Sequence, residues 1–309
     1  MTTIKNRYDF VYLFDCLDGN PNGDPDAANA PRLDPQTLQG IVSDVCIKRK
    51  VRNYVQQAYS GNSGRDIFIQ HHSPLNLRLD EACEKVGVKS YKQPDGTHNK
   101  NEAKARPTKE IRMIQKYLCE RYFDIRAFGG VLSTGPNAGQ IRGPLQLTFS
   151  RSVDSVFAFD LCITRIADVD KETEGEMGRK NLIPYGLYRC HGFINANLAQ
   201  EPNGTCFSEE DLSLLWESLK MMFDHDRSAS RGTMSAQMLT VFKHIGTDTD
   251  EKQRLAQAKL GCFPAHKLFE LIKIGKSTEN PRKYADYNVT TPQAGPLKDF
   301  PGVEVMRLL

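Results

Sequence analysis

The stretch YDFVYLFDCLDGNPNGDPD, residues 8–26, joins a strand-like run to a loop of turn-forming residues. Residues 8–17 are rich in aromatic and branched side chains, which predicts a β-strand. The following DGNPNGDPD contains two prolines, two glycines and five Asn or Asp residues, and this composition favours a long loop of fixed shape. A helical pattern follows at 36–57 and carries the basic run KRKVR at 48–52. We therefore ask what a shaped loop beside a cationic helix binds.

The loop has three interpretations. Five residues have the spacing of the first seven positions of a calcium-binding EF-hand loop: Asp18, Asn20, Asn22, Gly23 and Asp24. Calcium is disfavoured because position twelve is Asn29 instead of Glu, and because a strand precedes the loop. Asp24 and Asp26 can instead hold a catalytic magnesium ion, or the Asx side chains cap their own turns. Nucleic acid held along backbone amides is compatible with such capped turns.

The expected helix has an apolar stripe formed by Leu38, Ile41, Val42 and Val45. At about 100° per residue, this stripe continues to Arg49 and Arg52. A cationic end on an apolar face indicates that the helix leaves the core there and borders a polar partner. The alternative is that these side chains lay their stems on the core and extend to water.

Charge and cysteine usage narrow the class of protein. The 309 residues include 41 basic and 38 acidic side chains, with basic clusters at 48–52, 179–180 and 227–231. A basic stripe on a nearly neutral body suits a phosphate backbone better than a membrane surface. No apolar run approaches the roughly 20 residues of a membrane span, and the polar start predicts no secretion signal. The eight cysteines show no zinc spacing, so we expect reduced thiols in the cytoplasm, without a cofactor or bound metal.

The middle of the chain contains two insertions in the strand and helix pattern. Residues 61–105 predict an inserted subdomain, after which Thr108 can cap a helix. The glycine-rich segment 124–144 lacks a P-loop and a dinucleotide motif, so its glycines predict close backbone approach. Strands at 155–166 and 186–197 frame a protruding hairpin whose tip carries Met177, Gly178, Arg179 and Lys180.

The last third begins with Ser208-Glu-Glu-Asp211, a capping box that opens a helix with Trp216 in the core. HDRSASRG follows at 225–232, and a strand is expected at 238–245. His225 is interpreted as a structural hydrogen-bonding residue, and the adjacent His71 and His72 as loop residues. Four prolines predict that the tail past residue 276 runs mostly extended over the surface.

Without the insertions, the order is strand, helix, strand, strand, helix, strand. This is the ferredoxin-like plan of RNA-recognition motifs (RRMs), and it predicts an α+β fold. The aromatic signature by which those domains stack bases is absent, which favours tracking of a nucleic-acid backbone.

Seven blocks together resemble the backbone subunit of type I CRISPR Cascade complexes, the Cas-seven family, most closely its subtype I-C branch: NPNGDPD (20–26), NAPR (29–32), GIVSDVCIKRKVRNY (40–54), RAFGG (126–130), IRGPLQ (141–146), MGRK (177–180) and HDRSASRG (225–232). The resemblance implies a modified RRM-like palm (1–60, 106–165 and 183–275), an inserted finger region (61–105), a thumb hairpin (166–182) and an extended tail (276–309). It implies no nuclease activity, because a separately recruited helicase-nuclease cleaves the target.

The resemblance also implies that several copies stack head to tail along a guide RNA and present it for pairing with target DNA in antiviral defence. Further partners would be a large subunit, a guide-end-binding subunit and, where the complex contains one, a small subunit. Four residues would face guide phosphates: Lys48, Arg49, Lys50 and Arg52. Asn20, Asn22 and Gly23 would shape the groove, with Arg142, Arg227 and Arg231 as further RNA contacts, and residues 177–180 would belong to the thumb. The alternative is a metal-dependent endoribonuclease that uses Asp24 or Asp26, as in related subunits of type III systems.

Overall fold

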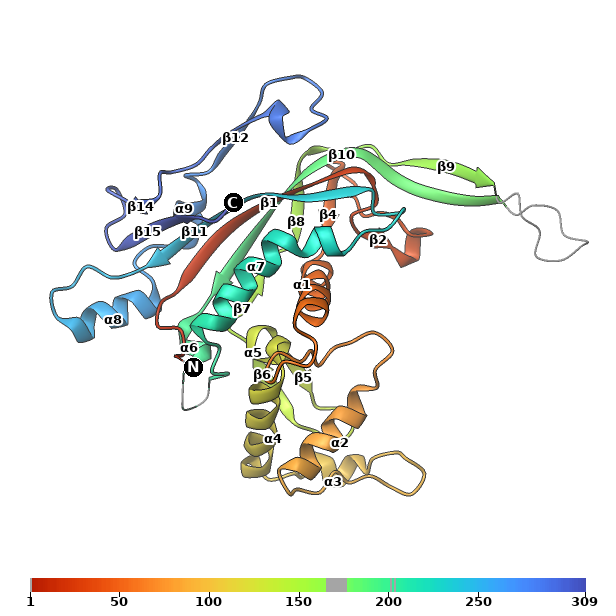
Figure 1. Cartoon of the computed structure of the whole chain (residues 1–309), viewed down its shortest axis with the longest axis vertical. Coiled ribbons are helices and arrows are strands. Elements are labelled where there is room, and N and C mark those ends of the chain that lie inside the picture. Colours follow the sequence, from red (N-terminus) through yellow and green to blue (C-terminus); the bar gives the residue numbers. More distant parts are fainter. Residues whose placement is uncertain (1, 165–176, 201, 203) are drawn as a thin grey trace, which may run out of the picture.

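The computed structural model describes residues 2–164, 177–200, 202 and 204–309 (Figure 1). It has the expected α+β fold, with α1 and α7 against one face of a large antiparallel sheet. No helix in these residues has both the length and the apolar composition that a membrane crossing requires. The elements in chain order are β1 (Tyr8–Gly19), β2 (Gly23–Asp24), η1 (Pro25–Ala27), β3 (Ala30–Pro31), β4 (Gln39–Val42), α1 (Asp44–Tyr59), α2 (Leu75–Lys85), α3 (Lys100–Lys104), α4 (Thr108–Arg121), α5 (Phe123–Phe128), β5 (Gly129–Leu132), β6 (Gly139–Arg142), β7 (Leu145–Leu147), β8 (Ser150–Ser155), β9 (Phe159–Thr164), β10 (Met177–Ile194), α6 (Ala196–Ala199), α7 (Glu209–His225), β11 (Thr233–His244), α8 (Glu251–Leu260), α9 (Ala265–Phe269), β12 (Lys273–Lys276), η2 (Tyr284–Asp286), β13 (Tyr287–Thr290), β14 (Gly295–Pro296) and β15 (Val303–Arg307).

The large sheet has the strand order β14-β15-β11-β1-β10-β8-β4, and β7 and β9 also pair with β10. β1 is central because it pairs with β10 on one side and β11 on the other. The strand predicted at 8–17 is confirmed, and the strand predicted at 238–245 corresponds to the second half of β11.

The helix-covered face holds the main core. Alternate residues of β1, Phe10, Tyr12 and Phe14, pack against α1 and α7, as the period of two in a strand requires. Trp216 of α7 is buried with its ring edge-on to Phe10, which confirms its predicted core position. The predicted capping box is also present at the start of α7.

The first helix begins later than the sequence pattern predicts. Residues 39–42 form β4 instead, because Leu38 takes a left-handed backbone (φ 55°) and Gly40 lies against the ring of Tyr188. Ser43 then caps α1. The predicted stripe is therefore wrong: Leu38 and Val45 are exposed, and the buried apolar side chains of α1 are Ile47, Val51, Tyr54 and Val55.

The helical lobe has a core of its own. α2, α4, α5, β5 and β6 share buried side chains that include Leu79, Ile114, Leu118 and Ile141. Residues 108–142, which we expected to belong with the sheet, thus pack with the insertion at 61–105 (Figure 1). The predicted close approach of glycines is confirmed at Gly129 and Gly143, where an added Cβ would lie within 2.3 Å of backbone atoms.

Two long strands form the arm at the right of Figure 1. β9 pairs with the start of β10, so that Arg179 lies opposite Cys162 and Lys180 opposite Leu161. The strand expected at 155–166 corresponds to β9, Phe159–Thr164, and begins later than predicted because β8 ends at Ser155, whereas the strand expected at 186–197 begins at Met177. Residues 166–176 of the expected thumb lie outside the described residues.

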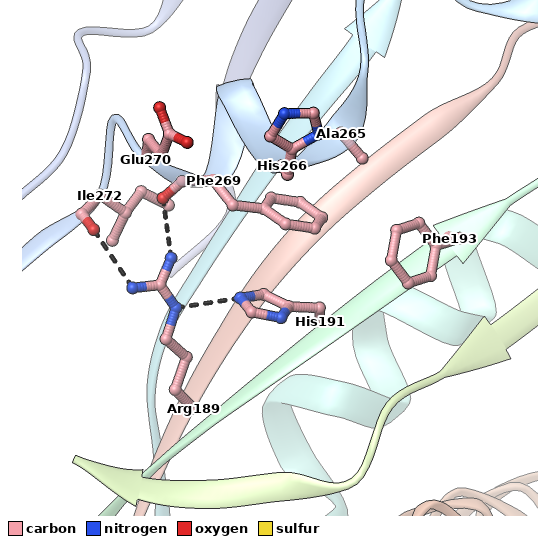
Figure 2. A pocket seen from close by; sticks show the side chains of 8 residues that line it. All are labelled: Arg189, His191, Phe193, Ala265, His266, Phe269, Glu270 and Ile272. Carbon is pink, nitrogen blue, oxygen red and sulfur yellow. Dashed lines mark hydrogen bonds between the residues drawn. The ribbon is translucent and has the colours of Figure 1, made fainter.

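The face of the sheet opposite α1 and α7 is covered by α9 and the C-terminal segment. β15 pairs with β11 and buries Val303 and Val305, because these residues alternate along a strand. The tail is extended as predicted, but it enlarges the sheet instead of only lying on the surface. In the same layer, the ring of His191 on β10 stacks on Phe269 of α9 at 4.4 Å (Figure 2).

We expect low pH to weaken this layer through His191. Its pKa falls from 6.5 to about 4, first because of burial and then because of Arg189. Since the folded pKa lies below the unfolded one, the neutral ring favours folding above about pH 6.5, and this contribution is lost as pH falls toward 4. The wild-type chain should therefore lose more unfolding free energy than His191→Gln between pH 6.5 and 4 in guanidinium titrations. Parallel pH profiles for the two proteins would contradict this assignment.

Candidate nucleic-acid interface

The loop after β1 is fixed to the start of α1. Asn22 Oδ1 accepts hydrogen bonds from the backbone N and the Oγ of Ser43, both at 2.9 Å. The same Ser43 Oγ accepts from the backbone N of Cys46 at the helix N-terminus. The shape of the loop and the start of the helix therefore depend on one another.

Asn20 and Gly23 give the loop its form. The buried Asn20 donates from Nδ2 to the Asn29 carbonyl at 2.6 Å, and its backbone N donates to Ser230 at 2.8 Å. A Cβ on Gly23 would lie 1.9 Å from Asn29 Oδ1 and 2.9 Å from the Asn29 carbonyl oxygen, so a larger residue would displace Asn29. The expectation that these residues shape the loop thus has a structural basis, although RNA contact by them stays a prediction.

The Asx side chains support the capped-turn interpretation over calcium. Asp24 Oδ1 accepts from the backbone N of Asp26 at 3.2 Å and lies 3.4 Å from Arg32. The loop follows strand β1, whereas an EF-hand needs a helix there. Among the described residues, no three His, Cys, Asp or Glu side chains are grouped to hold a metal ion.

The four cations of α1 divide into two pairs. Lys50 and Arg52 are 3% and 9% exposed, and they form ion pairs with Asp226 and Asp124. This corrects the expectation that all four face outward. Lys48 and Arg49 are partly exposed, but the Lys48 side chain is 13% exposed and its Nζ lies over the Phe128 ring at 5.7 Å, so Arg49 is the more available to a ligand. Lys48 Nζ lies 2.8 Å from Asp44, and Arg49 forms no ion pair with any described residue.

The end of α7 brings a second group of cations to the loop. Asp226 accepts from both Lys50 and Arg231, and the Arg231 side chain keeps 39% of its surface exposed. An added Cβ on Gly19 would lie 2.0 Å from the Arg231 carbonyl, so this segment lies directly against the loop. Arg227 pairs with Asp224 and is also exposed. The structure thus brings Arg231 to the loop and to α1.

The remaining predicted contacts lie elsewhere. Arg142 is on β6 in the helical lobe, where it lines a cavity of about 710 Å³ with Arg112 and Gln140. Figure 1 shows β6 below α1, apart from β2. Arg179 is exposed and Lys180 partly exposed on the arm, beside Met177 and Gly178 in β10. Arg142 thus forms a separate patch, whereas the arm borders the loop, because Asn181 next to Lys180 donates from Nδ2 to the Ala28 carbonyl at 3.4 Å.

The thiols of Cys16 and Cys46 and the imidazole of His225 are not arranged as catalytic groups beside the loop. Burial, and secondarily Asp15, raises the pKa of Cys16 to about 12, while Lys50 opposes this. Burial likewise raises the pKa of Cys46. His225 stacks edge-on against Tyr54 at 5.2 Å instead of meeting a nucleophile. The arrangement presents cations and a rigid backbone, which suits binding of a polyanion.

Sequence reasoning missed the acidic partners. Asp124 and Asp226 lie 72 and 176 positions from the cations they bind, so no local pattern connects them. The one available signal was that Asp226 falls within one of the blocks noted above, HDRSASRG.

The comparisons with known proteins agree with one another on family and fold. The sequence profile of the family described as "CRISPR-associated protein Cas7" matches residues 6–292. A protein of Haloferax volcanii named "CRISPR-associated protein Cas7" is 29% identical over 232 residues, which are 71% of this chain and 66% of that protein. The match thus spans slightly less than two thirds of the relative's length. A chain of a "CRISPR RNA-guided surveillance complex, pre-nicking" has a similar fold, with a TM-score of 0.50, 12% identity and 82% coverage of both chains.

We expect Arg52→Ala to lower the unfolding free energy by about 3–5 kcal/mol, because Asp124 would stay buried without its counter-charge. Arg49→Ala is the matched control on the same helix, with an expected change below about 0.5 kcal/mol. Urea denaturation followed by circular dichroism measures both. Equal losses in the two variants would show that the buried pair has no special structural role.

Proposed function

The chain belongs to the Cas7 family of CRISPR-associated proteins, and from this premise we propose that it is a non-catalytic backbone subunit that binds CRISPR guide RNA and oligomerises along it. The family match over residues 6–292 is the observation that carries this proposal. The proposed role includes presentation of the guide for pairing with target DNA in antiviral defence, in a subtype I-C Cascade complex in the cytoplasm.

We infer that the sheet with α1 and α7 is an RRM-like palm. The inner strand order β11-β1-β10-β8 supports this, because a ferredoxin-like plan places its fourth, first, third and second strands in that order. The helical lobe would be the finger, enlarged from 61–105 to about residue 142 by its shared core. The β9–β10 arm would be the thumb, and the proposed bounds 166–182 then begin after its first strand, β9.

The guide phosphates would lie over the loop at 20–32 and the exposed cations around it. Lys48, Arg49 and Arg231 would contact phosphates, and Arg227 would join them when its exposed pair with Asp224 opens. Lys50 and Arg52 would act indirectly, by holding α1 in place. Arg142 and the arm residues Arg179 and Lys180 would meet the RNA, or a neighbouring copy, at other points. Further partners would be the large subunit, the guide-end-binding subunit and, where the complex contains one, a small subunit.

RNA binding should depend strongly on salt, since phosphate contacts release counterions. For a single-stranded RNA, the double variant Lys48→Ala/Arg49→Ala should lower the slope of log K against log salt by about 1.4, which is roughly 0.7 for each lost contact. Fluorescence anisotropy between 50 and 300 mM salt measures the slope.

The matched control for the salt series is Lys252→Ala, which removes an exposed cation from α8, far from the loop in sequence. This variant should keep the wild-type slope. If the double variant has the same salt slope as Lys252→Ala, α1 is not part of the RNA interface.

The alternative is a metal-dependent endoribonuclease that uses Asp24 or Asp26. We expect guide RNA to stay intact when it is incubated with the protein and magnesium, the ion that would polarise the phosphate in such an enzyme. Asp24→Ala should leave the RNA pattern on denaturing gels unchanged, because Asp24 already accepts from Asp26 and pairs with Arg32. Cleavage at regular intervals that Asp24→Ala abolishes would favour the enzyme instead.

A further inference from the structure

The helical lobe, residues 61–142, carries more positive charge than the rest of the chain. It has 14 basic and 9 acidic side chains, a surplus of five, whereas the whole chain has 41 basic and 38 acidic side chains, a surplus of three. The remainder of the chain is therefore acidic by two charges. A cationic lobe on an otherwise slightly acidic protein indicates a partner of negative charge.

Exposed positive charge is concentrated along one face of α4. Lys109, Arg112 and Lys116 are exposed, and their spacing of three and four residues places them in one row on the helix. All three line the same shallow hollow on the outside of α4, together with Thr108 and Met113. We call these three cations the α4 row.

The α4 row has little negative charge beside it. Two of its three side chains form no ion pair with any described residue, and the third, Lys116, lies 4.0 Å from the exposed Glu120, which is a weak pair. Glu110, the other acid of α4, is already paired with the buried Arg106 at 3.2 Å. The row therefore keeps nearly all of its positive charge for an external ligand.

The row continues toward β6 on a rigid support. Two of its members also line the cavity of about 710 Å³ that holds Arg142, which is exposed and has no ion pair in the described part of the chain. Gln115 Nε2 donates to the carbonyls of Ala138 at 2.8 Å and Gln140 at 3.2 Å. These two hydrogen bonds hold the start of β6 against α4, so the cations of both elements keep a fixed arrangement.

The chemistry of this surface suits a phosphate backbone better than unpaired bases. Among the described residues that line the two hollows, none is aromatic, so bases have no ring on which to stack. The row from Lys109 to Lys116 extends over about 10 Å along α4. A nucleic-acid duplex presents about six negative charges over that length, in a stiff line that a straight helix can follow.

We propose that the α4 row binds the phosphate backbone of double-stranded nucleic acid, independently of base sequence. The proposal does not rest on the guide interface, because Figure 1 shows α4 below α1, whereas the loop strand β2 lies above it. A single strand at the loop and a duplex at the helical lobe would then occupy different surfaces of one chain.

The test measures duplex binding by the full chain. A fluorescent DNA duplex of mixed sequence is titrated by anisotropy over a series of salt concentrations, which gives the slope of log K against log salt. Lys109→Ala/Arg112→Ala/Lys116→Ala should lower this slope by about 2.7, since each contact with a duplex contributes roughly 0.9. The three side chains are exposed and alanine favours a helix, so α4 should keep its fold.

The matched control is Lys252→Ala/Arg254→Ala/Lys259→Ala, which removes the same charge from α8. That helix lies outside the helical lobe and begins with acids of its own, Asp250 and Glu251 (Figure 1). The control should therefore keep the wild-type slope with the duplex. An α4 variant with the same slope as this control would overturn the proposal, as would a wild-type chain that does not bind the duplex at low salt.

Single-stranded RNA separates this proposal from the guide interface. The α4 variant should keep the wild-type slope with that RNA, whereas Lys48→Ala/Arg49→Ala should lower the slope with RNA and keep it with the duplex. A loss confined to the duplex supports the α4 row even if Lys48→Ala/Arg49→Ala leaves RNA binding unchanged, in which case the guide interface alone fails. Equal losses of the α4 variant with RNA and with duplex would assign the row to the guide instead.

A second copy of the chain is the competing partner, since the remainder of the chain is acidic. Sedimentation velocity without nucleic acid tests it. We expect the wild type and the α4 variant to have the same oligomeric state. Self-association of the wild type that disappears in the α4 variant would overturn the proposal, because the row would then meet the acidic part of a neighbouring copy.

Discussion

The buried carboxylate of Asp124 fixes how the two lobes meet. It accepts from the backbone N of Phe68 at 2.7 Å, from the backbone N of Ile69 at 3.1 Å, and from Arg52 of α1 at 2.8 Å. Two residues later, Arg126 forms a bidentate pair with Asp211 of α7 at 2.7 and 2.9 Å. α5 is thereby joined to both helices that cover the sheet. Such pairs require exact complements, because a lone buried charge is very unfavourable.

This constraint explains why α1 presents only part of its positive charge. A helix turns about 100° per residue, so four cations in five positions cannot all face one way. Arg52 is committed to Asp124, and Lys50 to Asp226 at the end of α7. Arg49 is left on the outer side, whereas Lys48 is 13% exposed and lies over the Phe128 ring that Arg52 also faces. The basic run is thus divided between structural ion pairs and partly exposed cations.

Local patterns predicted the parts of the fold whose causes are local. The β1 strand, the capping box at Ser208 and the core position of Trp216 follow from alternation, hydrogen-bonding side chains and helical spacing. The predicted start of α1 was wrong because the apolar residues at 38–45 fit a helical period. In the structure, the close approach at Gly40 and the left-handed backbone of Leu38 favour a strand there. The sequence pattern could not show which cations of α1 are buried, since their burial depends on acids that lie far along the chain. The arm was recognised, but the start of β9 was predicted too early, at residue 155, because residues 156–158 contain no glycine or proline.

The net charge of the chain does not show which cations of the interface are free of a carboxylate partner. Pairing each cation with its nearest acid does. Lys48 is balanced by Asp44 and Arg227 by Asp224. Asp226 serves both Lys50 and Arg231, so two positive charges share one negative charge and leave one positive charge over. Arg49 adds another, because no described acid pairs with it. Arg49 and Arg231 are therefore the cations that lack a carboxylate of their own, while Asp18 and Asp26 are exposed acids of the loop without an ion pair among the described residues. Exposed pairs such as Arg227–Asp224 are weak enough for a phosphate to displace the carboxylate.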